Sequence, residues 1–232
     1  MNEKKDLFAG EVDRFKTENG VEIAFYSIKH ATIAIEVSGK WIYVDAVTKG
    51  AEPETDFTDM PKADCLLFTH DHYDHFDTDA VAQLSKEGTE IIGNQSVIDT
   101  LGCGKALKNG ESAMVFGEWK LEAVPAYNTS DEKLDFHPKG RDNGYILTID
   151  GLRTYIAGDC EPIEEMSEIK DIDIAFLPCN LPFTMTPEQC AEAARIVKPA
   201  VLFPYHYGDT QINRVADLLE GSGMDVRIRS YR

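Results

Sequence analysis

The feature that most constrains this chain is a seven-residue segment, residues 69–75, which reads THDHYDH. It contains three of the chain's six histidines and two aspartates. The mostly apolar residues 63–68 before it are typical of a buried strand, and a helical pattern begins near Ala80 after it. Imidazole and carboxylate groups in a segment without cysteine suit a divalent metal in a catalytic site better than a structural zinc. The sequence therefore predicts a metal site in a loop between a strand and a helix.

The alternative interpretation of this segment is a polar loop whose histidines only cap the helix. His70 and His72 lie two residues apart, so on an extended backbone they point to the same side and can bind one ion. Asp74 and His75 follow where the chain turns into the helix, and they face a second position beside the first. Four side chains of ligand type at these spacings favour the metal site over the capping loop.

Length and charge limit the class of protein. A chain of 232 residues, 43% of them hydrophobic, can bury a large core. No linker rich in proline, glycine or serine divides it, so we expect one domain over residues 1–232. The formal net charge of −18 disfavours binding to nucleic acid or to an anionic membrane. We find no signal peptide, no apolar run of the ~18 residues that a membrane span needs and no CxxC pair, so we expect a cytoplasmic protein with reduced thiols.

Strand patterns dominate the first half of the chain, and helices alternate with strands in the second half. Residues 31–37 alternate in polarity as a strand does, and Asp150-Gly151 predicts the turn of a hairpin. Thr186-Pro187, with glutamine at the third helical position, predicts the start of a helix. Strands first and alternation later fit two packed sheets with helices outside.

Two further ligand candidates follow predicted strands, where sheets present functional side chains. Asp159 comes after Gly158 at the end of one strand, and His206 comes between two tyrosines after another. Taken alone, such an aspartate is usually a turn residue and such a histidine a satisfied core group. Together with the segment 69–75, both become candidates for metal ligands.

The order of these motifs resembles that of the metallo-β-lactamase-fold hydrolases. The HxHxDH pattern of residues 70–75, then Gly158-Asp159, then His206 carries the resemblance, which extends from about His30 to Gly208. Within that superfamily the chain is most similar to the compact branch that includes ascorbate-6-phosphate lactonase. The resemblance implies an α/β fold, a four-layer αββα sandwich, with a two-metal centre at one edge of its sheets.

The resemblance also implies the ligands and the chemistry. Two divalent ions, zinc or alternatively manganese, would activate a hydroxide that attacks a small ester, lactone or phosphodiester. Asp74 would orient the hydroxide. The implied ligands are His70 and His72 for the first ion, Asp74, His75 and His206 for the second, and Asp159 as the bridge between the two.

One position departs from the family pattern. Asn128 stands where the family supplies a third histidine to the first ion. We expect His137, in the loop that follows, to occupy that place, because imidazole is a better zinc ligand than an amide oxygen. Weak coordination by Asn128 and a surface location for His137 are the alternatives. If His137 does not reach the site, an oxygen-rich site that prefers manganese becomes the better interpretation.

The same loop and its surroundings contain candidates for substrate binding. Lys139 and Arg141 would suit a phosphate or carboxylate on an anionic substrate, unless they belong to an ordinary solvated loop. Tyr205 is a candidate donor to a developing oxyanion, or packs the rim of the site, and Asn128 is a further substrate candidate. His30 either orients a ligand carboxylate or is a core histidine at the start of a strand.

Three functions are compatible with this sequence. The first is a metal-dependent hydrolase of a small molecule, with Asp74 as its catalytic carboxylate. The second is a non-catalytic metal-binding or regulatory protein that kept the fold, which Asn128 favours and the otherwise complete ligand set disfavours. In the third, a neighbouring subunit completes the substrate pocket, and the sequence does not decide whether the chain forms a homo-oligomer. The charge disfavours a nuclease, and the missing export signal disfavours a secreted β-lactamase.

Overall fold

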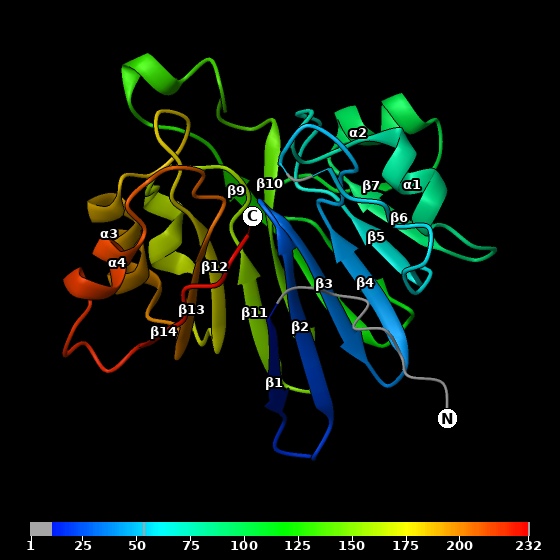
Figure 1. The fold of residues 1–232 in the computed structure, drawn as a ribbon, viewed down its shortest axis with the longest axis horizontal. Coiled ribbons are helices and arrows are strands. Elements are labelled where there is room, and N and C mark those ends of the chain that lie inside the picture. Colours follow the sequence, from blue (N-terminus) through cyan, green and yellow to red (C-terminus); the bar gives the residue numbers. More distant parts are fainter. Residues whose placement is uncertain (1–10, 53, 232) are drawn as a thin grey trace.

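The computed structural model of the chain describes residues 11–52 and 54–231. Two seven-stranded sheets face each other, and each has helices on its outer side (Figure 1). Helices α1 (Thr78–Leu84) and α2 (Gln95–Leu101) lie beside the first sheet, and α3 (Pro187–Val197) and α4 (Asn213–Leu218) beside the second. This arrangement confirms the predicted four-layer αββα sandwich.

The first sheet contains the first seven strands in sequence order. They are β1 (Val12–Lys16), β2 (Glu22–Lys29), β3 (Thr32–Val37), β4 (Lys40–Val44), β5 (Cys65–Leu67), β6 (Glu90–Gly93) and β7 (Lys105–Ala106). Strands β1 to β4 pair antiparallel, which short turns allow, whereas β4 to β7 pair parallel and need the longer connections that contain α1 and α2.

The second sheet repeats this plan with the remaining strands. They are β8 (Ser112–Val115), β9 (Trp119–Ala126), β10 (Asp142–Ile149), β11 (Leu152–Ile156), β12 (Ile174–Pro178), β13 (Val201–Tyr205) and β14 (Asp225–Val226). Strands β8 to β11 are antiparallel and β11 to β14 are parallel. The predicted hairpin turn at Asp150-Gly151 joins β10 to β11.

Loops from the two sheets meet at one edge of the sandwich and are hydrogen-bonded to each other there. The amide of Asn143, at the start of β10, donates to the carbonyl of Thr69 after β5 at 3.1 Å. The amide of His206, after β13, donates to the carbonyl of His30 between β2 and β3, also at 3.1 Å. Polar side chains that follow strands of different sheets are thereby brought together.

Local sequence signals explain where the helices begin. Thr186 and Gln189 form the predicted capping box at the start of α3, with Pro187 as the first helical residue. Asp77 caps α1 by accepting a hydrogen bond from the amide of Ala80. Two short 3₁₀ segments, η1 (Asp131–Lys133) and η2 (Glu164–Glu168), lie in the loops of the second sheet.

Aromatic residues contribute strongly to the core between the sheets. The rings of Phe176 and Phe203 stack at 4.8 Å, and Phe25 from the first sheet lies 5.9 Å from Phe176. A second cluster, which includes Tyr43 and Leu84, fills the space between the first sheet and α1. All five cysteines are free thiols, as the spacing predicted, and no helix in the described ranges is long and apolar enough to cross a membrane.

A buried carboxylate ties the first strand to the C-terminal segment. Asp13, in β1, is only 6% exposed and accepts hydrogen bonds of 2.7–2.8 Å from the guanidinium groups of Arg227 and Arg229. Burial alone would raise the pKa of Asp13, but the hydrogen bonds from the two arginines outweigh it and hold the pKa below its usual 3.8. The contacts join β1 to residues 227–229.

We expect Asp13→Asn to lower the free energy of unfolding by about 2 kcal/mol at pH 7, because two guanidinium groups lose a charged acceptor. The folded-state pKa is lowered, so this stability is complete above about pH 4 and is lost as the pH falls through the folded-state pKa. Urea unfolding of both proteins from pH 7 to pH 3 should show the difference shrinking. Glu22→Gln, which removes an exposed partner of Arg14, is the matched control and should cost less than about 0.5 kcal/mol. An Asp13→Asn protein as stable as wild type at pH 7 would contradict this account.

Candidate metal centre

The segment 69–75 forms the loop between β5 and α1, as the sequence predicted. The amides of His75 and Phe76 both donate to the carbonyl of His72 at 2.9 Å, which curls the loop tightly. Asp77 fixes its far end, since one carboxylate oxygen caps α1 and the other accepts from the hydroxyl of Thr48 at 2.9 Å. The loop therefore presents its histidines from a backbone that is anchored at both ends.

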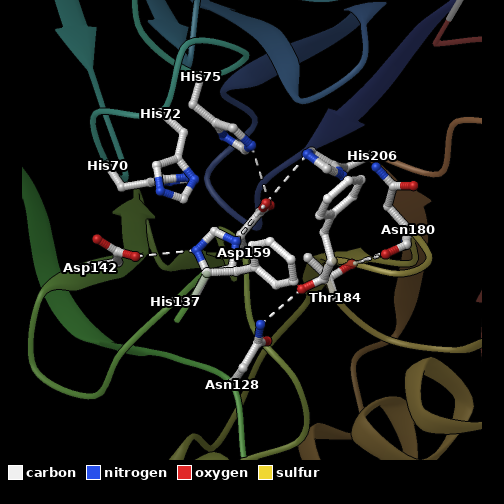
Figure 2. A network of polar contacts seen from close by, with 12 residues as sticks. His70, His72, His75, Asn128, His137, Asp142, Asp159, Asn180, Thr184 and His206 are labelled. Carbon is white, nitrogen blue, oxygen red and sulfur yellow. Dashed lines mark hydrogen bonds and ion pairs between the residues drawn. The ribbon is translucent and has the colours of Figure 1, made fainter. Parts of the chain in front are cut away.

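The ligand-type side chains gather into overlapping groups (Figure 2). Within each group, one nitrogen or oxygen atom of every residue lies within 4.8 Å of those of the others. The groups are His70, His72 and His137; His30, Asp74, His75 and His206; and His70, His75 and Asp159. Residues from both sheets contribute, so the centre lies at the edge where the loops of the two sheets meet.

Asp159 lies between the other two groups. Its Oδ1 is 3.3 Å from His75 Nε2, and its Oδ2 is 3.3 Å from His137 Nε2 and 3.4 Å from His206 Nε2. Gly158 makes this position accessible, because it has a φ of +65° and because a Cβ there would lie 2.8 Å from the carbonyl oxygen of Asn143. The carboxylate is thus placed within reach of both groups of histidines (Figure 2).

The residues fit a divalent metal, because several of their buried polar atoms lack a hydrogen-bond partner among the described residues. These atoms are His70 Nε2, His75 Nε2, His206 Nε2 and Asp159 Oδ1. Burying a polar atom without a partner is costly, and native structures rarely contain several such atoms side by side. Metal coordination by nitrogen and oxygen atoms removes that cost.

Two histidines of the loop, His70 and His75, are oriented by hydrogen bonds that involve Asp45 and Thr69. Asp45, at the end of β4, is fully buried and accepts from Nδ1 of His75 at 2.9 Å. The same carboxylate accepts from the amide of Thr69 at 2.8 Å and from its hydroxyl at 2.7 Å. The Thr69 hydroxyl in turn lies 2.9 Å from His70 Nδ1. Holding Nδ1 of each ring leaves Nε2 directed at the centre, which is the usual arrangement around metal-binding histidines.

A second carboxylate orients His137 in the same way. Nδ1 of His137 lies 3.2 Å from Oδ2 of the buried Asp142. Arg141 donates to both oxygens of Asp142, from Nε at 2.7 Å and from Nη2 at 2.8 Å. The same Nη2 lies 3.1 Å from His72 Nε2. Arg141 therefore holds the carboxylate that holds His137, and it contacts a second histidine of the same group.

The charge of the centre favours a bound cation. Burial lowers the pKa of His70 well below its usual value, so this imidazole is neutral and free to coordinate. Burial would also lower the pKa of His75, but the facing carboxylates of Asp159 and Asp74 raise it well above its usual value. Two ionised carboxylates thus demand positive charge at this position. A divalent ion supplies that charge in place of protons.

The structure brings together all seven residues that the sequence suggested as ligands. They are His70, His72, Asp74, His75, His137, Asp159 and His206. His137 reaches the group of His70 and His72, whereas the side-chain nitrogen of Asn128 donates to the carbonyls of Lys133 at 3.1 Å and Phe183 at 2.8 Å. The backbone amide of Asn128 donates to the carbonyl of His137 at 2.8 Å. Asn128 therefore supports the loop that places His137.

The suggested substrate residues are engaged with other groups of the protein or buried. The ammonium group of Lys139 lies 2.8 Å from Glu165 and 3.0 Å from the hydroxyl of Tyr127, and Arg141 is paired with Asp142. Tyr205 is fully buried in the core, where a substrate cannot contact its hydroxyl. The expectations of an anion-binding role for the two cations and of an oxyanion-stabilising role for Tyr205 therefore have no support in the geometry.

His30 is a site residue that the sequence left undecided. It occupies the tight turn between β2 and β3 with a φ of +48°, and its Nε2 lies 3.0 Å from Asp74 Oδ2. Its ring centroid is 3.8 Å from that of His206. Burial, together with His206, lowers the pKa of His30 to about 4, so the ring is neutral at pH 7. The sequence signal that could have identified His30 as a site residue was its position in a two-residue turn between apolar strands. Asp142 carried no such signal, since it follows an arginine in a polar loop.

Comparisons with known proteins agree with the fold and with a metal-dependent hydrolase. The family model described as "Beta-lactamase superfamily domain" matches residues 24–206. A UPF0173 metal-dependent hydrolase of Thermococcus kodakarensis is 30% identical over 187 residues, which cover 77% of this chain and 81% of the relative. One of Ligilactobacillus salivarius is 31% identical over 186 residues, with 77% and 82% covered. The crystal structure of a Parabacteroides distasonis protein assigned as a metal-dependent hydrolase is 50% identical, with a TM-score of 0.92, and covers 96% of this chain and 100% of its own.

We expect Asp142→Asn to weaken metal binding about 10–100-fold, because His137 loses the carboxylate that orients it. Zinc affinity would be measured by competition with a chromophoric chelator. Asp135→Asn, which changes an exposed carboxylate of the same loop, is the matched control and should bind zinc as wild type does. Equal affinities in Asp142→Asn and Asp135→Asn would show that His137 does not hold an ion.

Proposed function

This chain belongs to the family of the beta-lactamase superfamily domain and is a metal-dependent hydrolase, and on that basis we propose the reaction that it catalyses. The proposed reaction is hydrolysis of a small ester, lactone or phosphodiester with the help of two divalent ions. The observation that carries the proposal is the position of Asp159, whose two oxygens lie 3.3–3.4 Å from histidines of two different groups.

We assign the ligands from these distances. His70, His72 and His137 would hold one ion, Asp74, His75 and His206 would hold the other, and Asp159 would contact both. Three imidazoles in the first group favour zinc, and manganese is the alternative for the second group because it contains more oxygen. When bound, two such ions lower the pKa of a shared water and polarise the oxygen of the bond that is attacked.

Asp74 is the proposed catalytic carboxylate. Burial would raise its pKa, but the charge of His75, the nearby ring of His206 and the contact with His30 lower it far below its usual value. The carboxylate therefore stays ionised, and it is too weak a base to take a proton from water. Its role is to accept a hydrogen bond from the attacking water and so to orient it. Asp74 lines the cleft beside the centre, where a substrate would arrive.

The non-catalytic alternative depended on Asn128 in place of a ligand histidine. With His137 beside His70 and His72, the first group contains three imidazoles without Asn128. The cleft next to the centre further favours an enzyme, since a site that only stores metal needs no space for a substrate. We also propose that residues 1–232 form a single domain, because the centre draws side chains from both sheets.

Elemental analysis should find about two zinc or manganese ions per wild-type chain, and His137→Ala should retain about one. Asn128→Ala is the matched comparison, and we expect it to keep both ions, because its side chain bonds to carbonyl groups of the supporting loop. Two ions in His137→Ala would remove this histidine from the ligand set. One ion or none in wild type would contradict the binuclear proposal.

We expect chelator treatment to abolish hydrolysis of activated esters and added zinc to restore it. Asp74→Ala should lower kcat at least ~100-fold, because the attacking water loses the carboxylate that orients it and one ion loses a ligand. Asp71→Asn changes an exposed carboxylate three residues earlier in the same loop and should remain as active as wild type. An Asp74→Ala protein with wild-type kcat would refute the mechanism.

A further inference from the structure

A cleft of about 640 Å³ opens beside the centre. His30 and Asp74 line it and connect it to the ligand groups. Its volume falls in the range of small-molecule sites, ~300–1,000 Å³. Four aromatic side chains form much of the remaining wall, namely Tyr73, Phe183, Tyr207 and Tyr231. The space next to the centre is therefore bounded in part by aromatic rings.

Two exposed apolar side chains line this cleft. The structure places seven large hydrophobic side chains of the described ranges at the surface. Tyr73 and Phe183 are the two that line the cleft, and Leu181 lines an adjoining one. Phe136 and Phe183 pack edge-to-face at 5.2 Å and join their two loops. Tyr73 is 74% exposed. Exposed apolar groups gathered at a cleft, unlike single ones spread over a surface, mark a binding site.

The cleft offers an anionic ligand no described cation. Its ionisable wall residues, apart from tyrosines, are His30, Glu52, Asp74 and Asp209, and the described part of its wall contains no lysine or arginine. Arg214 lies in an adjoining cleft, where its guanidinium contacts Glu188 at 3.4 Å. A phosphate or carboxylate buried against this wall would lose its hydration without a described cation to pair with. A phosphate or carboxylate on the bound part of the substrate is disfavoured.

A cationic group is not favoured either. Asp74 is engaged by His30 at 3.0 Å and His206 at 3.5 Å, and Asp209 has an interaction of its own. Glu52 is exposed to solvent, where its attraction for a cation is weak. The aromatic wall is thus the main source of binding energy, and it acts by burying apolar surface.

We propose that this cleft binds an uncharged apolar group of the substrate, so that the chain hydrolyses esters or lactones in which this group is neutral rather than esters in which it is anionic. The inference rests on the hydrolase function proposed above. In the reaction, the water oxygen bonds to the acyl carbon and the bond from that carbon to the alcohol oxygen breaks. One water proton goes to the alcohol oxygen, and the acid formed releases the other to solvent. Phe183 and Tyr73 determine specificity by contacting the apolar group.

The first experiment compares p-nitrophenyl acetate, butyrate and octanoate with p-nitrophenyl hemisuccinate and bis(p-nitrophenyl) phosphate, all with zinc-loaded protein. We expect kcat/KM to rise at least ~10-fold from acetate to octanoate, since each buried methylene adds to binding. The hemisuccinate, which resembles butyrate in size but carries a charge, should be at least ~10-fold poorer than butyrate. Phe183→Ala should lose most of the chain-length preference. Met114→Ala, which truncates an exposed apolar side chain on β8, should keep it.

A second experiment measures binding of the uncharged dye Nile red, which needs neither metal nor turnover. Wild type and Met114→Ala should bind it equally, and Tyr73→Ala and Phe183→Ala at least ~5-fold more weakly. Dye binding of this pattern without hydrolysis of any ester would refute the hydrolase function and leave the apolar cleft supported. Three results would each overturn the inference. They are equal dye binding in all variants, a preference for the hemisuccinate over the butyrate, and dye affinity that falls as protein concentration rises, as when a second copy covers the cleft.

Discussion

The structure depends on a buried carboxylate that must be balanced by positive charge. Asp159 is only 2% exposed, and its oxygens face histidines that come from the loop after β5, the loop before β10 and the end of β13. An unpaired buried carboxylate would be very costly, so these loops are held together only while cationic or metal-binding groups surround it. Both sheets contribute to that arrangement. The need to balance the negative charge of Asp159 therefore holds loops of both sheets together at the metal centre.

Hydrogen bonds outside the centre decide how precisely it is built. Asp45 holds His75 and, through Thr69, His70, and Asp142 holds His137 while Arg141 neutralises it. Each carboxylate is fully buried, so these contacts lie in a low-dielectric environment where they are strong. Asn128 adds a third support by fixing the loop around His137 through backbone and side-chain bonds. The ligand directions are thus set before any ion binds.

The cleft beside the metal centre has aromatic side chains in its wall, whereas the centre itself is built from histidines and carboxylates. The chain carries a net charge of −18, yet the surface beside its site exposes Tyr73, Phe183 and Leu181. Acidic surface elsewhere keeps such a protein dispersed, which permits an apolar rim where a substrate is bound. In the function we propose, the metal centre supplies reactivity and the aromatic wall supplies selectivity. The two share the loop of Tyr73, which lies between His72 and Asp74, whereas Phe183 lies on a loop that carries none of the proposed ligands.

The sequence by itself indicated two packed sheets with helices outside, the start of α3 at its capping box and the ligand candidates of residues 70–75, because these depend on local patterns and short spacings. His137 was expected only because the family resemblance calls for a third histidine. The sequence did not predict β1, whose residues form a strand only by pairing with β2. Contacts between distant segments were decided by the tertiary structure alone: the approach of His137 to His70, the contact of His30 with Asp74, and the aromatic cleft. Each joins residues more than 40 positions apart, and no local propensity specifies how two sheets pack. Lys139 shows the same limit, since its ion pair with Glu165 joins residues of two separate loops and no local pattern predicted it.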